Sequence, residues 1–183
     1  MTRAGAAPHV LYSFPGAIGR PGIGTTAYHQ VQGIIDKGVK VSLYCTSVER
    51  PVAGAHEVVT TLSVAGRRVP HRALGVQRAY RYHDRRVARR LTAGRGRPDL
   101  VHCWPGAVIQ TAQAARAAGV RSVREVINTH TGWGFERVAR EIASLGMPLP
   151  RGHSHSYDAR KLEREEAEFR AVDLLSAQSE FSK

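Results

Sequence analysis

The chain has 183 residues, 42% of them hydrophobic, and carries 27 Lys and Arg against 15 Asp and Glu, a net charge of +12. This length and apolar content predict one soluble domain of ordinary size, and no apolar run approaches the roughly 20 residues that a membrane span needs. The excess of positive charge favours phosphates, nucleic acids or anionic lipid surfaces as partners.

Strand and helix patterns alternate along the chain. We expect strands over residues 9–14, 39–44, 99–103, 122–127 and 172–177, one or two short strands within 56–64, and helices over 25–37, 76–93, 107–118 and 158–171. Residues 132–155 look irregular around a short helical piece over 136–145, and residues 179–183 look like the cut start of a further helix. Such alternation predicts an α/β fold with a parallel sheet and helices on both faces.

The first strand is followed by a glycine-rich segment, residues 15–24, which we interpret as a flexible crossover. It contains Gly16, Gly19, Gly22 and Gly24. A strand that opens through glycines onto a helix N-terminus offers backbone N–H groups and a positive dipole end to an anion. The dinucleotide fingerprint does not fit, because Gly22 lies eight residues beyond Phe14 and no acid ends the second strand. A plain flexible loop and a loop that closes on a phosphate or sugar both stay open.

Two histidines come at or just past the ends of predicted strands. His102 ends one strand, and His130 follows another within the polar run Asn128-Thr129-His130. Ligands of open α/β sheets gather at this edge, so these residues are candidates for the edge of a cleft. A structural, hydrogen-bonding role is the competing interpretation of each histidine.

Other polar side chains give weaker signals. Cys45 and Cys103 are interpreted as reduced, buried thiols, and His153-Ser-His155 has no third ligand nearby, so we expect no metal site. The acids of the last helix, Glu163, Glu165, Glu166 and Glu168, are most simply a solvated face.

The helix over residues 76–93 concentrates the positive charge. Arg78, Arg81, Arg85 and Arg89 fall on one stripe at helical spacing, with Val76, Tyr80, Val87 and Leu91 on the opposite side. We therefore expect the arginine stripe to be exposed, either as a solvated face or as a surface that meets anions. Nucleic acid is not expected, because the helix lacks interleaved aromatic residues for stacking on bases.

Taken together, these stretches resemble the N-terminal domain of a family 4 glycosyltransferase with the GT-B architecture. The resemblance rests on Val10-Leu-Tyr-Ser-Phe-Pro15 with the glycine-rich segment, on residues 28–41, on Pro98-Asp-Leu-Val-His102, on Asn128-Thr-His-Thr131, and on residues 162–169 running into 172–179. It implies one of two Rossmann-like domains that face each other across a cleft. The first domain of that pair mainly holds the acceptor, and the second mainly holds the nucleotide-sugar.

The same resemblance implies roles for particular residues. The glycine-rich segment and Thr25 would close near the donor diphosphate, and His130 would lie beside the transferred sugar. His102, Asn128 and Thr129 would lie at the acceptor side of the cleft. Family members are usually retaining, metal-independent enzymes that use a nucleotide-sugar as substrate and no cofactor.

The resemblance also implies a C-terminal nucleotide-sugar-binding domain that is absent from this chain, so we expect residues 1–183 alone to be an inactive half of a hexosyltransferase. The acceptor stays open between a small molecule and a lipid-linked one. We expect a cytoplasmic protein, and a peripheral position at the inner face of an anionic membrane, reached by the arginine stripe, stays open. The alternative is a stand-alone, non-catalytic Rossmann-like ligand-binding module.

Overall fold

The computed structural model describes residues 7–64, 67–69, 74–94, 96–149, 153 and 156–177. Its main sheet has six strands in the order β3-β2-β1-β6-β7-β8, and every neighbouring pair is parallel. The strands are β1 (His9–Ile18), β2 (Lys40–Val48), β3 (Glu57–Thr60), β6 (Leu100–Cys103), β7 (Arg121–Val126) and β8 (Leu174–Ala177). A small antiparallel pair, β4 (Ser63–Val64) and β5 (Arg67–Arg68), stands apart from this sheet.

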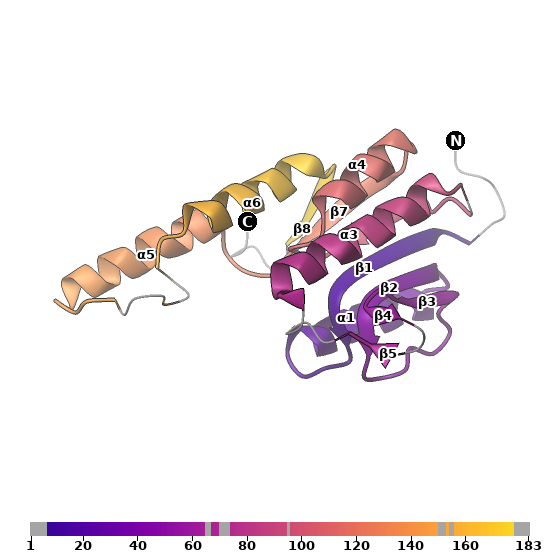
Figure 1. Ribbon diagram of the computed structural model, residues 1–183, viewed down its shortest axis with the longest axis horizontal. Helices are drawn as coiled ribbons and strands as arrows, with labels where there is room; N and C mark the ends of the chain where they lie inside the picture. The colour runs from indigo at the N-terminus through magenta and orange to yellow at the C-terminus, as the bar shows by residue number, and fades with distance from the viewer. Residues whose placement is uncertain are drawn as a thin grey trace.

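The helices connect successive strands and cover both faces of the sheet (Figure 1). They are α1 (Ile23–Asp36), α3 (Val76–Thr92), α4 (Ile109–Ala117), α5 (Thr131–Ser144) and α6 (Ala159–Ala171). Figure 1 shows α3, α4 and α6 on one face, α1 on the other, and α5 projecting outward beyond α6. The predicted fold class, a Rossmann-like parallel sheet with helices on both faces, is confirmed.

Alternation along β1 creates the two halves of the core. Leu11 packs with Val87 of α3 and Ala112 of α4, whereas Tyr12 packs with Val31 of α1. Successive side chains of a strand point to opposite faces, so a continuous apolar run such as β1 serves both layers at once. The two thiols, Cys45 and Cys103, are both fully buried and free, as predicted.

Several boundaries differ from the sequence prediction, most of all around the first strand and in residues 132–155. Strand β1 extends to Ile18 and α1 begins at Ile23, so the connection is much shorter than residues 15–24. The register shifts between Phe14 and Ala17, and this bulge accommodates Pro15, which has no N–H to donate to the sheet. Helix α5 covers a segment predicted to be largely irregular. The predicted further helix at residues 179–183 lies outside the described residues.

Candidate functional site

A cavity of about 230 Å³ opens at the carboxyl ends of the central strands. It collects residues that are far apart in the sequence but adjacent at this edge of the sheet. They are Phe14, Pro15 and Gly16 of β1, Ile23 of α1, Tyr80 of α3, Trp104, Pro105 and Gly106 after β6, and Ile127 after β7. Ligands of doubly wound folds bind at this edge, because connecting loops diverge there and leave a crevice. We call this space the strand-end cavity.

Two glycines let aromatic rings form its walls. Gly106 has φ +92°, and a Cβ at that position would collide with the Tyr80 ring. A Cβ at Gly16 would lie 2.7 Å from Cζ of Phe14. Side chains larger than hydrogen would therefore push both rings out of place. The cavity keeps its shape only while these positions remain glycine.

The N-terminus of α1 borders the cavity through Ile23. Its N-cap residue, Gly22, offers no side chain to cap the helix, and the first turn contains no acid. The Thr25 hydroxyl donates to the carbonyl oxygen of Arg20 at 3.1 Å, so it is engaged within its own loop. The helix therefore presents the positive end of its dipole beside the cavity, which favours an anion.

Internal contacts hold the glycine-rich connection in place. The Gly19 N–H donates to the carbonyl oxygen of Gly24 at 2.9 Å. A Cβ at Gly19 would collide with Arg50, and one at Gly24 would collide with the carbonyl oxygen of Ala17. These contacts show that the segment is closely packed at Gly19 and Gly24. Close packing inside the protein accounts for Gly19 and Gly24, whereas Gly22 has open space around it.

A chain of buried polar side chains supports the cavity wall at Trp104. The Trp104 Nε1–H donates to the Tyr12 hydroxyl at 2.6 Å, and that hydroxyl donates to Oε1 of Gln30 at 2.6 Å. The Gln30 amide donates to Oε1 of Glu125 at 3.2 Å, and Oε2 of Glu125 lies 3.0 Å from Nε2 of His102. Burial raises the pKa of Tyr12 strongly, so its hydroxyl stays protonated. These bonds fix the orientation of the indole ring.

His102 therefore belongs to the support beneath the cavity. Its ring lies 4.7 Å from the Tyr12 ring between centroids, and its side chain is 12% exposed. It is not among the residues that line the cavity. Of the two interpretations left open by the sequence, the structure favours the hydrogen-bonding one.

His130 takes a more open position at the N-cap of α5. Its side chain is 42% exposed, with Nε2 3.9 Å from Oε2 of Glu165, and its ring lies 6.0 Å from that of Phe169. The same Glu165 oxygen accepts the N–H of Thr131 at 2.7 Å. Glu165 therefore holds both the start of α5 and the imidazole.

Asn128 and Thr129 lie between His130 and the cavity residue Ile127. Asn128 is exposed and Thr129 is half-buried. This short polar connection leads from the cavity wall to the N-cap of α5.

Glu168 supports the cavity wall, a role that the sequence interpretation missed. It was assigned to a solvated face, yet it is 3% exposed. One carboxylate oxygen lies 2.9 Å from Nε of Arg124, and the other accepts the N–H of Gly106 at 2.9 Å. Desolvation raises its pKa, and the Arg124 charge opposes that shift. The pair ties α6 and β7 to the cavity wall at Gly106. The signal that could have indicated a buried acid is Arg124, a charged residue in the middle of a predicted strand.

The arginine stripe is exposed, as predicted: Arg78, Arg81, Arg85 and Arg89 all face solvent. Val76, expected on the opposite, apolar side, is 50% exposed and is a correction. It lies in the first turn of α3, and the buried face of the helix is formed instead by Ala79, His83, Asp84, Val87 and Leu91.

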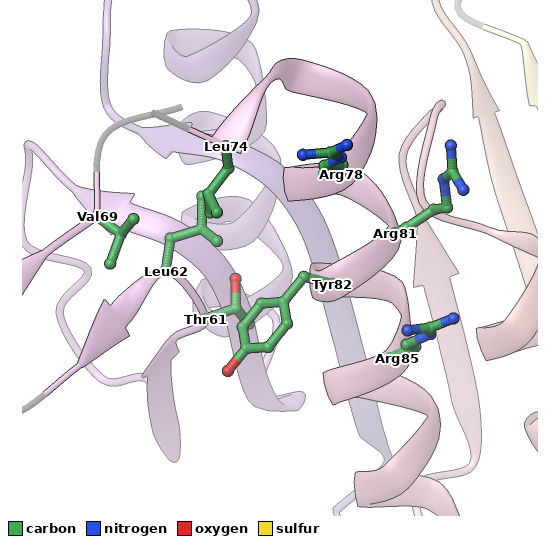
Figure 2. A pocket seen from close by; sticks show the side chains of 8 residues that line it. All are labelled: Thr61, Leu62, Val69, Leu74, Arg78, Arg81, Tyr82 and Arg85. Atoms are coloured by element: carbon green, nitrogen blue, oxygen red, sulfur yellow. The ribbon is translucent and has the colours of Figure 1, made fainter. Parts of the chain in front are cut away.

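Three of the four stripe arginines line a second cavity of about 420 Å³ (Figure 2). We call it the α3 cavity. Its other lining residues are Thr61, Leu62, Val69, Leu74 and Tyr82. Arg89 is not among them.

The described residues contain neither a metal-ligand cluster nor a membrane-spanning helix. No three His, Cys, Asp or Glu side chains in this part of the chain are grouped as a metal site would require. None of the helices that it contains is both long enough and apolar enough to span a bilayer.

Comparisons with known proteins agree with this geometry. The sequence model of the family described as Glycosyltransferase Family 4 matches residues 21–183. No curated protein matches the chain. Among solved structures, that of TcCGT1 in complex with UDP is similar, with a TM-score of 0.62 and 12% identity. The match covers 95% of this chain and 45% of that one.

Two further solved structures are similar at lower scores. The glycotransferase of kitacinnamycin has a TM-score of 0.43 at 18% identity, covering 81% of this chain and 38% of that one. A UDP-N-acetylglucosamine 2-epimerase has a TM-score of 0.48 at 10% identity, covering 97% and 43%. The chain thus spans less than half the length of each of the three structures.

Proposed function

Because the chain belongs to glycosyltransferase family 4, we propose that it is the acceptor-side domain of an enzyme that transfers a hexose from a nucleotide-sugar to an acceptor. The observation that carries this proposal is the strand-end cavity, with the uncapped N-terminus of α1 on its border. The apolar wall suits the part of the acceptor that lies next to the transferred sugar, and the helix dipole suits a diphosphate. Both features occur at the edge of the sheet where such folds bind ligands.

For the donor, we assign the diphosphate to the N-terminus of α1. Gly22 supports this assignment, because the space around it is open and its residue type brings no Cβ between the backbone and a phosphate. The structure of TcCGT1, which has a similar fold, was solved with UDP. A bound diphosphate at this point would face the strand-end cavity across Ile23.

His130 is our candidate for the residue beside the transferred sugar. Its partial exposure leaves the ring accessible, and the Glu165 carboxylate, 3.9 Å from Nε2, restrains the ring. A neutral imidazole can hydrogen-bond a sugar hydroxyl or an oxygen of the leaving group, and such a bond accelerates transfer to the extent that it strengthens in the transition state. Asn128 and Thr129 would then meet the acceptor.

The remaining groups of the active site would come from a second, C-terminal domain. The chain spans 45% of TcCGT1, which supports an arrangement in which a further domain supplies the donor pocket. We propose transfer with retention and without a metal, the diphosphate being stabilised by cationic side chains of that domain. The enzyme would be cytoplasmic.

One experiment tests the proposal directly. Full-length enzyme and the isolated 183 residues are incubated with a panel of nucleotide-sugars, and nucleoside diphosphate release is measured with and without candidate acceptors. We expect acceptor-dependent release by the full-length enzyme and none by residues 1–183. Turnover by the isolated chain would contradict the proposal that a second domain is needed for transfer. If the full-length protein binds a nucleotide-sugar without any turnover, the stand-alone binding module is the better interpretation.

An anionic membrane surface stays a prediction from the exposed stripe of four arginines. Each basic residue near such a surface contributes about 1 kcal/mol of attraction, which is screened by salt. Co-sedimentation with anionic vesicles at low salt tests it. If the wild type stays in the supernatant, a water-soluble acceptor is the better account.

A further inference from the structure

The α3 cavity combines an apolar wall with a row of cations. Figure 2 shows Thr61, Leu62, Val69 and Leu74 on one side, facing the ring of Tyr82 on α3, with Arg78, Arg81 and Arg85 along the helix. Arg78, Arg81, Tyr82 and Arg85 are spaced i, i+3, i+4 and i+7 and therefore share one face of the helix. The α3 cavity has a volume of about 420 Å³, which is in the range of small-molecule sites.

The three arginines at this cavity keep their side chains exposed. Within the described residues, none of the three forms an ion pair, in contrast to Arg90, which lies 3.8 Å from Glu57. The acid closest to them in the helix, Asp84, faces the other way. It is 5% exposed, and its carboxylate accepts the N–H groups of Gln110 and Thr111 at 3.0 and 2.9 Å. The positive charge is thus left available to a ligand.

We propose that the α3 cavity binds the acceptor substrate, and that this acceptor is an amphipathic anion: an apolar body carrying a phosphate or carboxylate group. The apolar body would rest against Leu62 and Tyr82, and the anion would meet the guanidinium groups, whose planar donors match phosphate and carboxylate oxygens. The identification of this ligand as the acceptor rests on the proposed function.

The position of the cavity agrees with that role. Tyr80 lines the strand-end cavity and Tyr82 lines the α3 cavity, so a single helix separates the two spaces. An α-helix with its side chains is about 10–12 Å across. An acceptor held by its anionic end at α3 could therefore extend its reactive end around the start of the helix toward the transferred sugar.

The lining set favours a cavity ligand over a lipid surface. A flat anionic membrane would meet all four stripe arginines, including Arg89. Among the four stripe arginines, a ligand held in the cavity meets the three that line it, Arg78, Arg81 and Arg85. Arg89 therefore separates the two explanations.

The test measures binding of 1-naphthyl phosphate to the purified protein by calorimetry at physiological salt. Its controls are inorganic phosphate and 1-naphthol, each of which carries half of the chemistry. We expect both to bind at least about tenfold more weakly, because each loses either the charge-assisted bonds or the apolar contact. Inorganic phosphate that binds as tightly as the naphthyl ester would overturn the proposal.

Two matched triple variants remove the same charge from different places. R78Q/R81Q/R85Q should weaken naphthyl phosphate binding at least about tenfold. R89Q/R140Q/R160Q, which changes three exposed arginines outside the cavity, should weaken it less than about twofold. Equal losses would show unspecific attraction to a basic protein and would overturn the site. Thermal melting confirms that each variant is folded, and single Arg→Gln variants give a second reading if the triple variant is not.

Tyr82→Ala tests the apolar wall separately. Tyr82 is 40% exposed, so its truncation should leave the fold intact. Naphthyl phosphate should bind several-fold more weakly and inorganic phosphate unchanged. No effect on either ligand would contradict a site at this wall. The last measurement is co-sedimentation with anionic vesicles. If the protein binds vesicles but not naphthyl phosphate, and if vesicle binding depends on Arg89 as much as on the three cavity arginines, membrane docking explains the arginine stripe and the cavity proposal is wrong.

The acceptor role has its own readout. If the full-length enzyme glycosylates phosphorylated amphiphiles no better than their uncharged counterparts, the assignment as acceptor site fails even if binding is as expected. If the full-length enzyme turns over no nucleotide-sugar with any acceptor, the proposed function is wrong. The binding results for the α3 cavity do not depend on that outcome.

Discussion

The two cavities on either side of α3 are built in different ways. The strand-end cavity is assembled from β1, α1, α3 and the segments after β6 and β7, and its walls are held by buried polar contacts from residues that do not line it, such as Glu168 and Tyr12. The described residues that line the α3 cavity all lie between Thr61 and Arg85, and its cations are exposed. The first should therefore respond to distant changes in the core, and the second mainly to its own surface charge.

The largest effect should come from Glu168→Ala. This change leaves Arg124, itself nearly inaccessible, as an unpaired buried cation and frees the Gly106 N–H. We expect the free energy of unfolding in urea to fall by about 3–5 kcal/mol. Glu166→Ala is the control: it removes an exposed partner of Arg170 and should cost less than about 1 kcal/mol. Equal losses would show that the buried pair is not what secures the strand-end cavity.

His130→Ala should affect chemistry at the strand-end cavity and leave the α3 cavity unchanged. In the full-length enzyme we expect turnover to fall by roughly ten- to a thousandfold, because a hydrogen bond made in the transition state is lost. His29→Ala, an exposed histidine on α1, is the matched control. The melting temperature should not change, since the His130 side chain is 42% exposed. Normal turnover in a folded variant would remove His130 from the site.

Gly106→Ala tests how tightly the strand-end cavity is packed. The new Cβ would collide with the Tyr80 ring in a backbone conformation with φ +92°. Gly146→Ala has a positive φ of +62° as well but meets no atom nearby, so it isolates the backbone cost. We expect Gly106→Ala to lower unfolding stability by about 1–3 kcal/mol more than its control. The comparison between cavities would be weakened if the two variants were equally stable.

His9 belongs to neither cavity and should give the smallest effect. Burial, followed by the charge of Lys40, lowers the pKa of His9 below its ordinary value of 6.5, and its Nε2 lies 2.9 Å from the Ser42 hydroxyl. Below that pH the unfolded chain binds more protons than the native protein, so stability should fall as pH decreases from 7 towards 5.

His9→Asn removes this titration. It should flatten the pH dependence of unfolding by less than about 1.4 kcal/mol per pH unit, with ligand binding at both cavities unchanged. A slope identical to that of the wild type would show that other groups produce the acid sensitivity.

The architecture followed from local patterns in the sequence, and the exceptions have physical causes. The strands and helices recur with their own periods, so the parallel sheet and the exposed arginine face were predictable. The end of β1 was not, because Pro15 and Gly16 usually terminate strands and only the neighbouring β2 keeps this segment paired beyond the bulge. Helix α5 was underestimated because its glycines disfavour a helix unless the chain around it supports one.

Hydrophobic periodicity and charge were enough to establish the fold class, the buried thiols and the basic face of α3, because each of these depends on residues close together in the chain. Tertiary structure decided the rest. His102 bonds Glu125 in the support of the cavity, and Glu168 is buried against Arg124. The Thr25 hydroxyl donates within its own loop, and three arginines lie beside the apolar wall at Leu62. Contacts between residues dozens of positions apart depend on how strands and helices pack in space, and local sequence patterns do not determine that packing.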